Sequence, residues 1–151
     1  MSHLAPWHFS RGARRFPKLA HEHDELRAAL RKLDLVAGQV TCPPPGHAFL
    51  GIMRQLGSYL PPELAAHAAQ EEAVLYPVLA QRIGQAGIEA LKAQHQALQA
   101  LAPAFGALAA RELTESSWGA VRAAAERLGE VLSVHLDDEE AAIDRALRCA
   151  S

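Results

Sequence analysis

The spacing His-x-x-x-Glu occurs twice in this chain, once from His67 to Glu71 and once from His135 to Glu139. Residues four apart lie on one face of an α-helix, so each pair presents an imidazole and a carboxylate in the same direction. Apolar residues recur at steps of three and four on that face, before and after each pair. We therefore expect both pairs to point into a helical core, where buried polar groups need a compensating partner.

The composition predicts an all-α protein of one domain. Half of the 151 residues are hydrophobic, Ala and Leu dominate, and strand-forming residues are sparse. No apolar run approaches the length that crosses a membrane. Short connections between the helices predict an up-down-up-down four-helix bundle over residues 17–151, preceded by a tail of residues 1–16. We expect the helices to cover about 17–40, 47–82, 87–111 and 118–149.

Inward positions follow from the three-and-four steps along each predicted helix. In the second helix the inward face continues beyond its His-Glu pair through Val74 and Val78, and the first helix includes Phe16 at its start. The pair Pro61-Pro62 should kink or interrupt the second helix, because proline lacks a backbone N–H and clashes with the preceding turn.

Two further histidines, His23 and His95, occupy inward positions on the first and third predicted helices. With a rise of about 1.5 Å per residue, the polar inward positions lie roughly 9 to 22 Å from a common end of the bundle. They can therefore meet in one layer. Burying even one unpaired polar group costs about 1 to 3 kcal/mol, so a cluster needs a shared partner. We expect a pair of metal ions to be held by His23, His67, Glu71, His95, His135 and Glu139.

The ligand types narrow the choice of metal. Imidazole and carboxylate without thiolate suit iron, manganese or zinc. A structural zinc site is usually closed by four ligands that include cysteine, whereas six ligands around two ions leave positions for water, an oxo or hydroxo bridge, or a diatomic ligand. The ferritin-like pattern uses Glu-x-x-His, where this chain has His-x-x-x-Glu. We expect two iron ions per chain, with manganese or zinc able to substitute.

The residues around these positions also resemble a known family. The likeness is carried by Glu22-His23-Asp24-Glu25-Leu26, by His67-x-x-x-Glu71-Glu72 with Leu75-Tyr76-Pro77-Val78-Leu79 after it, by Gln94-His95-Gln96-Ala97-Leu98, and by His135-x-x-x-Glu139-Glu140. In combination they resemble the hemerythrin-like, or HHE cation-binding, family over roughly Lys18 to Arg148. The resemblance implies that the four histidines are terminal metal ligands and that the two glutamates bridge two irons.

One position departs from the respiratory hemerythrins. These carry His-x-x-x-His on the third helix, whereas this chain has Gln99 four residues after His95, which argues against a simple oxygen carrier. Glu72 and Glu140 each follow a proposed bridging glutamate. We expect them to form surface or supporting hydrogen bonds, with the alternative that one supplies the ligand that Gln99 cannot. Tyr76 either packs in the core or lies near the site as a hydrogen-bond donor or redox-active neighbour.

Charge and cysteine content indicate which partners and which cellular compartment to expect. The formal net charge of −2 gives no general attraction to nucleic acid or to an anionic membrane. Cys42 and Cys149 are too few for a disulfide framework, and we interpret them as reduced thiols at opposite ends of a bundle in a cytoplasmic protein. The other histidines lie off the inward faces and should be solvated: His3, His8, His21 and His47.

Two function classes follow from a diiron centre. In the first, the protein binds dioxygen, nitric oxide or iron itself, as a sensor, scavenger or store. In the second, the centre consumes peroxide or nitric oxide and the protein is an oxidoreductase, for which Glu72, Glu140 and Tyr76 are the available general acids or bases. A third class is a metal-free helical interaction module. The residue pattern alone leaves binding and catalysis open.

Overall fold

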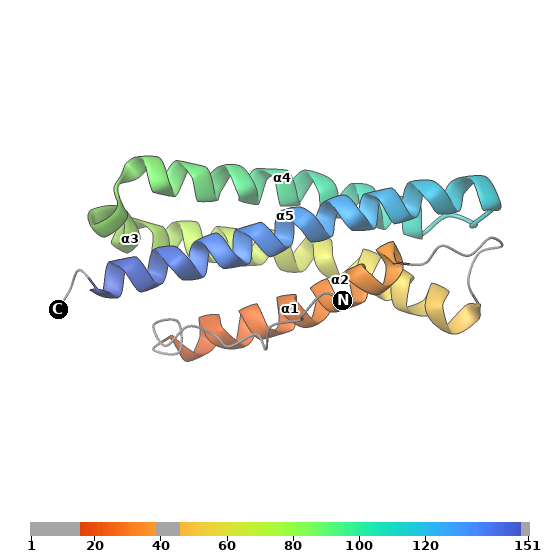
Figure 1. Cartoon of the computed structure of the whole chain (residues 1–151), viewed down its shortest axis with the longest axis horizontal. Coiled ribbons are helices and arrows are strands. Elements are labelled where there is room, and N and C mark those ends of the chain that lie inside the picture. The colour runs from red at the N-terminus through yellow and green to blue at the C-terminus, as the bar shows by residue number, and fades with distance from the viewer. Residues whose placement is uncertain (1–15, 39–45, 149–151) are drawn as a thin grey trace.

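The computed structural model describes residues 16–38 and 46–148. Within these residues the chain is helical apart from short turns and contains no β-strand, as the composition predicted. Cys42, Cys149 and residues 1–15 of the predicted tail lie outside the described residues. The elements, shown in Figure 1, are α1 (Pro17–Ala37), α2 (His47–Gln70), which continues through the π-helical turn η2 (Glu71–Leu75) into α3 (Tyr76–Ile83), α4 (Gln85–Ala109) and α5 (Glu115–Arg148).

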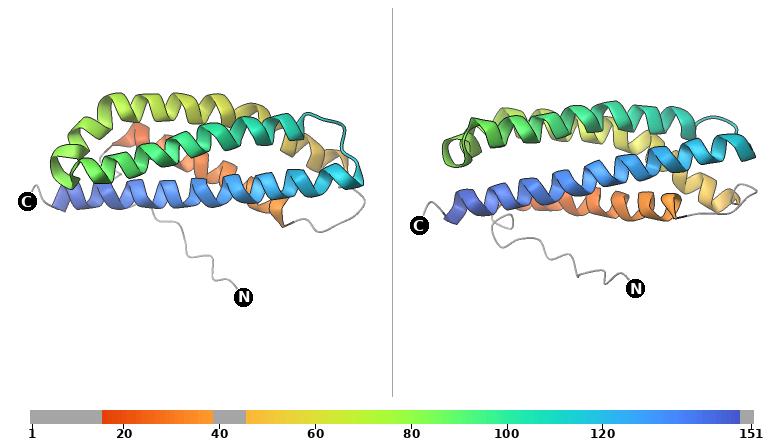
Figure 2. Two further views of the ribbon diagram at one scale, coloured as in Figure 1. Left: turned by 90° about the horizontal axis from the view of Figure 1, so that it is seen from above. Right: turned by 45° about the horizontal axis from the view of Figure 1, so that its top comes forward.

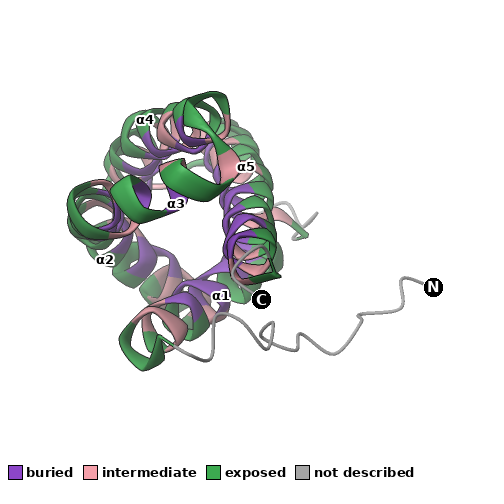
Figure 3. Ribbon diagram, turned by 90° about the vertical axis from the view of Figure 1, so that its left-hand side faces the viewer, coloured by how far each residue is buried: buried purple, intermediate pink, exposed green. Residues whose placement is uncertain are grey.

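These helical segments surround one core, and the buried residues face its axis (Figure 3). α2 packs on α4, α4 on α5, α5 on α1 and α1 on α2, so the contacts form a closed ring. The short α3 packs on α4 and α5 at one end of the bundle, and the α4–α5 connection lies at the opposite end (Figures 1 and 2). No described helix is both long enough and apolar enough to cross a lipid bilayer.

Proline, glycine and hydroxyl residues set the helix boundaries. Pro17 lies in the first turn of α1, where its missing N–H costs no hydrogen bond. Gly84 has φ = 84°, which glycine adopts without strain, and its turn separates α3 from α4. Before α5, the backbone N–H of Ser117 donates to Oγ1 of Thr114 at 3.3 Å, and the N–H of Thr114 donates to Oγ of Ser117 at 2.8 Å.

The paired prolines of the second helix lie inside it. α2 runs without a break through Pro61 and Pro62, and its first half is inclined to the rest of the helix (Figure 1). Because Pro61 has no N–H, the carbonyl of Gly57 loses its usual donor one turn later. That carbonyl faces α4, since a Cβ on Gly106 would lie 2.6 Å from the Gly57 oxygen. Glycine at both positions therefore lets α2 and α4 touch through their backbones.

The apolar core is divided into two clusters. The larger fills the half of the bundle that includes Trp118, and Leu64, Leu98 and Leu132 belong to it. The six polar side chains lie between this larger cluster and the smaller one. The smaller cluster consists of Tyr76, Leu79, Ile88, Leu91, Ala142, Ile143 and Ala146. The predicted polar layer therefore interrupts the core between two apolar regions.

The predicted inward face of the second helix is wrong beyond Glu71. Val74 and Val78 are 67% and 61% exposed, and Tyr76 and Leu79 are buried in their place. The inward face has therefore moved by one or two residues within a single turn. Phe16, predicted to begin the first inward face, precedes α1 and is also exposed.

The π-helical turn explains this shift. The backbone N–H of Tyr76 donates to the carbonyl of Glu71, five residues earlier, so η2 holds one residue more than an α-helical turn. Pro77 follows immediately; it has no N–H, and its ring would clash with the carbonyl of Ala73 in a regular α-helix. The wider turn removes that conflict and rotates Tyr76 onto the face that carries Glu71.

Candidate metal centre

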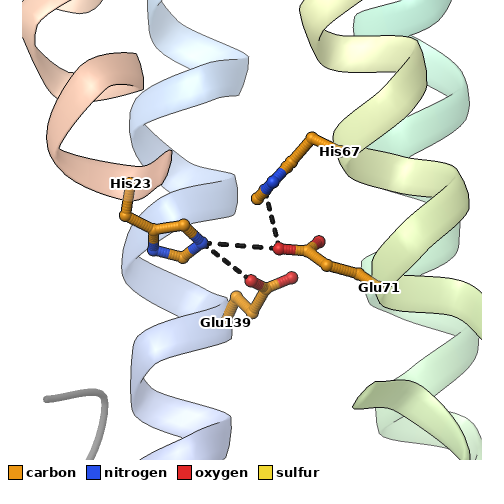
Figure 4. A group of neighbouring side chains, drawn as sticks. All are labelled: His23, His67, Glu71 and Glu139. Atoms are coloured by element: carbon orange, nitrogen blue, oxygen red, sulfur yellow. Dashed lines mark hydrogen bonds and ion pairs between the residues drawn. The ribbon is translucent and has the colours of Figure 1, made fainter. Parts of the chain in front are cut away.

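The six side chains predicted to bind metal lie together in the buried layer between the two apolar clusters. α1 contributes one histidine, α2 and η2 one histidine and one glutamate, α4 one histidine, and α5 the last histidine and glutamate. Figure 4 shows four of them converging on a common point. Each is at most 6% exposed, and together they are His23, His67, Glu71, His95, His135 and Glu139.

These residues form two overlapping groups. In each group one nitrogen or oxygen atom per residue lies within 4.8 Å of the others. The first group contains His23 and His67, the second contains His95 and His135, and both contain Glu71 and Glu139. A donor set of two histidine pairs that share two carboxylates would fit a pair of metal ions.

The two oxygens of Glu71 face different histidine pairs. Its Oε1 lies 2.7 Å from Nε2 of His67 and 3.5 Å from Nε2 of His23 (Figure 4). Its Oε2 lies 3.0 Å from Nε2 of His95 and 4.0 Å from Nε2 of His135. One carboxylate therefore offers one oxygen to each side of the centre.

Glu139 is arranged in the same way. Its Oε1 lies 3.0 Å from Nε2 of His23, and its Oε2 lies 3.5 Å from Nε2 of His135. All four histidines thus turn Nε2 toward the two shared glutamates. The opposite ring nitrogen, Nδ1, faces outward in each.

Each outward nitrogen has a side-chain partner from another helix. The Nδ1 atom of each of the four histidines lies 2.8 to 3.3 Å from a carboxylate or amide oxygen. An Nδ1–H donated in this way fixes the ring orientation and leaves Nε2 as the free ligand atom, as is usual for metal-bound histidine. The pairs are His67 with Glu22, His95 with Glu72, His135 with Gln94, and His23 with Glu140.

Tyr76, the first residue of α3, reaches the centre directly after the π-helical turn. Its hydroxyl donates to Oε2 of Glu139 at 2.7 Å and lies 3.2 Å from Nε2 of His95. Its ring stacks on the imidazole of His95, with ring centroids 5.3 Å apart and an angle of 6° between the planes. Of the two alternatives for this residue, the structure favours the hydrogen-bond donor near the site.

Comparison with known proteins agrees with this geometry. The family model of the hemerythrin HHE cation binding domain matches residues 14–146, nearly the whole chain. The chain belongs to the hemerythrin HHE family. No curated protein and no solved structure gave a match.

The donor set of this HHE domain fits a metal pair. Nε2 of His67 and Nε2 of His135 are buried without a hydrogen bond, although an oxygen of Glu71 lies 2.7 Å from the first. Buried polar atoms of this kind are rare because each costs free energy. A metal ion at each side of the centre would compensate both nitrogens and the charge of the glutamates together.

The pKa values of the two glutamates differ in direction. Burial alone would raise the pKa of Glu71, but its contacts with His23, His67 and His95 lower it strongly. Burial raises the pKa of Glu139 to about 7, and the nearby charge of Glu71 adds to that effect. Without metal, Glu71 therefore carries the negative charge of the centre, whereas Glu139 readily holds a proton.

The histidines are also unequal. Burial opposes the charged form of His23, yet hydrogen bonds to Glu139, Glu140 and Glu71 raise its pKa to about 11. Burial and the neighbouring His95 lower the pKa of His135 to about 3. In the metal-free HHE domain His23 is therefore protonated at neutral pH and His135 is not.

The supporting residues extend beyond the histidines. Arg27 donates to Glu140 at 3.0 Å and to Asp137 at 3.1 Å, so it holds the carboxylate that contacts His23. Gln94 donates its amide N–H to Asp138 at 2.7 Å while its oxygen contacts His135. These links connect the buried centre to the surface of α5.

Sequence reasoning placed the six central residues on inward helix faces, where they lie, but did not identify all of their supports. Glu72 and Glu140 contact His95 and His23, as the favoured interpretation expected. Glu22 and Gln94 had received no role, although each precedes a proposed ligand directly. Adjacency to a ligand was the available signal, because all four supports stand next to a central residue in the chain.

The remaining histidines and Gln99 lie apart from the centre. Gln99 is exposed on α4 and belongs to neither group of candidate ligands. His21 and His47 are exposed, in agreement with the prediction that they are solvated. His3 and His8 lie outside the described residues.

Proposed function

We propose that the chain is an up-down-up-down hemerythrin-like bundle that holds two iron ions and binds or reacts with a small ligand such as dioxygen, nitric oxide or peroxide. The observation that carries this proposal is the division of each shared carboxylate between two histidine pairs. His23 and His67 would hold one ion, His95 and His135 the other, and Glu71 and Glu139 would bridge them. Manganese or zinc could occupy the same ligands.

Bound iron would supply a redox-active centre with positions for a small ligand, because six protein ligands do not fill the coordination of two ions. The chain itself supplies orientation and exclusion of water. The Nδ1 contacts hold the imidazoles in place, and the apolar clusters on both sides keep the layer dry. Among the ligands considered, an apolar diatomic molecule suits such a buried centre best.

A second candidate function, an oxidoreductase that consumes peroxide or nitric oxide, is favoured by Tyr76. Its hydroxyl lies 2.7 Å from Oε2 of Glu139 and 3.2 Å from Nε2 of His95, so it holds a proton beside the centre, and burial together with the charges of Glu139 and Glu71 raises the pKa of this hydroxyl. A general acid in this position is what catalysis needs and simple binding does not. A metal-free interaction module is disfavoured, because it would leave buried nitrogens of His67 and His135 without hydrogen bonds.

Metal content tests the proposal directly. Protein purified without a polyhistidine tag should carry about two iron atoms per chain, and its absorption should change when the reduced protein meets oxygen. His67→Ala and His135→Ala should each remove most of the iron, since each deletes a ligand. The matched control is His21→Ala, an exposed histidine on α1 that should change nothing. Full iron in both ligand variants would defeat the metal-centre proposal.

We also propose a cytoplasmic location for the protein. Two cysteines in the whole chain suit a reducing, cytoplasmic compartment, and the small net charge gives no reason to expect nucleic acid or a membrane as partner. Thiol titration of the native protein should give two free thiols. A disulfide between Cys42 and Cys149 would contradict the reduced setting.

A further inference from the structure

Three cavities reach residues that touch the centre, and they differ in charge. The first, of about 420 Å³, is lined mainly by apolar side chains, among them the exposed Phe16, Val74 and Val78, and its Lys18 partly offsets the charges of Glu22 and Glu71. The second, of about 500 Å³, reaches Gln94 between α4 and α5, and Arg145 and Arg148 line it beside Asp138. Neither lining favours a divalent cation, since one is mainly apolar and the other is basic.

The third cavity, which we call the acidic pocket, lies between α1 and α2. It has a volume of about 60 Å³, enough for a few water molecules, and it is lined by Glu22, Glu25, Glu63, Tyr59 and His67. Three carboxylates around so small a space create a negative potential that attracts cations. Lys18, 3.9 Å from Glu22, offsets part of this charge, and His21 lies 3.3 Å from Glu25.

His67 links the acidic pocket to the centre. Its Nδ1 lies 3.3 Å from Glu22, which lines the pocket, and its Nε2 lies 2.7 Å from Glu71 inside the centre. The side chain is more than nine-tenths buried, and Nε2 has no hydrogen bond. A side chain that lines the acidic pocket and also belongs to a group of candidate ligands is a second observation, independent of the carboxylates, that points to a metal ion.

Tyr59, which also lines the acidic pocket and belongs to the same helix as His67, responds to the same field. Burial raises the pKa of its hydroxyl, and the charges of Glu63 and Glu25 raise it further. These two carboxylates therefore act on a group that lines the pocket, and neither belongs to the groups of candidate ligands.

We propose that divalent metal ions reach the centre through the acidic pocket, with Glu25 and Glu63 attracting the hydrated ion and His67 as the first central ligand that it meets. This inference rests on the proposed metal centre and adds a direction of loading to it. Glu22 has a double position, because it lines the pocket and also orients His67. The apolar cavity beside Glu71 is left to uncharged molecules.

The rate of metal loading tests the path. Metal-free protein mixed with Co²⁺ in a stopped-flow instrument reports binding through the visible absorption of the ligated ion. Glu25→Gln combined with Glu63→Gln should lower the association rate constant roughly five-fold at low ionic strength. The difference should shrink at about 0.5 M salt, where charges are screened within a few ångströms. The final amount of bound metal should stay unchanged, because neither residue belongs to the candidate ligands.

Two further variants separate the path from general charge effects. Glu126→Gln combined with Glu130→Gln makes the same change in net charge on exposed positions of α5, and should leave the rate within about two-fold of the parent. Ala66→Trp fills the mouth of the acidic pocket from an exposed position and should slow loading at both low and high salt. Helical content and melting temperature verify that every variant is folded.

The outcomes distinguish the path from the centre itself. Unchanged loading rates in both pocket variants, or equal slowing in the α5 control, would overturn the access path while leaving a metal-binding centre intact. A parent protein that binds no metal at all would overturn both proposals. Slower loading confined to the pocket variants, with full final occupancy, is the result we expect.

Discussion

The two His-x-x-x-Glu segments have the same spacing and lead to different local structures. After Glu139 the helix α5 continues without interruption, and Ile143, four residues later, packs in the smaller apolar cluster. After Glu71 the backbone widens into η2, and the residue that returns to the inward face is Tyr76, five residues later. An apolar residue thus follows one glutamate at the core, and a phenol follows the other.

The two glutamates also differ in the direction in which their pKa values are shifted. Glu71 meets three histidines and its pKa is lowered, whereas Glu139 meets the charge of Glu71 and has a pKa raised to about 7. The hydroxyl that η2 brings inward donates to Glu139, so the turn after the first segment serves the glutamate of the second. The His-x-x-x-Glu spacing places a histidine and a glutamate on one face of a helix. The residues that follow each glutamate then influence the pKa values of the two glutamates.

Substituting each glutamate by glutamine should give the largest contrast. In metal-free protein at pH 6, where Glu139 is mostly neutral and Glu71 is ionised, Glu71→Gln should cost about 3 to 5 kcal/mol, because it removes the ionised partner of buried histidines. Glu139→Gln should change stability by less than about 1 kcal/mol, because a raised pKa favours the neutral form that glutamine imitates. Urea unfolding of chelator-treated protein measures both. Equal costs would mean that the two glutamates carry the same charge.

Matched single-residue deletions probe the π-helical turn. Removing the exposed Ala73 and replacing the exposed Pro77 by alanine, so that no proline ring clashes with the preceding turn, should convert η2 to a regular α-helical turn with Tyr76 still inward, at a cost below about 1 kcal/mol. Removing the exposed Ala141 from α5 should rotate Ala142, Ile143 and Ala146 out of the core and cost about 3 kcal/mol or more. Chemical denaturation compares the two. If the Ala73 deletion is as damaging as the other, the extra residue is not what sets the register.

Removing one hydroxyl tests the connection between the segments. Tyr76→Phe should destabilise the metal-free protein by about 1 to 2 kcal/mol, since it leaves Oε2 of the buried Glu139 without its donor. The control Tyr59→Phe, at a partly exposed tyrosine, should have almost no effect on stability. Thermal unfolding decides between them, and an unaffected Tyr76→Phe variant would show that the contact contributes nothing.

Proton release on metal binding gives an effect that builds up gradually with pH. The pKa of His23 is raised from 6.5 to about 11, so its interactions stabilise the metal-free protein fully below 6.5 and are lost as the pH rises through 11. At pH 8 to 10, where Glu139 is already ionised, a metal ion must displace this proton, so affinity should rise with pH by about 1.4 kcal/mol per unit. His135, with a pKa near 3, releases none. Calorimetry in buffers of different ionisation enthalpy counts the protons, and a pH-independent affinity would contradict this assignment.

Periodicity was sufficient to predict the helices and the convergence of the six central side chains. Inward steps of three and four placed His95 and His135 correctly, because α4 and α5 are regular around them. The same rule failed at Val74 and Val78, because it assumes a constant residue number per turn and η2 has one more. Pro77 was the local sign that a regular turn was unfavourable there.

Helical periodicity could not predict the supporting contacts, for a different reason. Glu22 and Gln94 lie beside the inward face, and each acts on a histidine of a neighbouring helix. Their partners depend on how adjacent helices are rotated against each other, which a single helix does not encode. The bond of Tyr76 to Glu139 is of this kind as well, since it joins the π-helical turn to α5.

The closed ring of Nδ1 contacts means that no helix of the bundle can adjust alone. Each helical segment carries, at neighbouring positions, a ligand for the centre and a support for the histidine of the next segment, as Glu22 and His23 do on α1. A rotation of one helix that improved the position of its ligand would misalign the support that the same helix provides to its neighbour. Evolution of the centre is therefore constrained to coordinated changes on two helices, and a single substitution at a support will be felt at a metal ligand contributed by its neighbour.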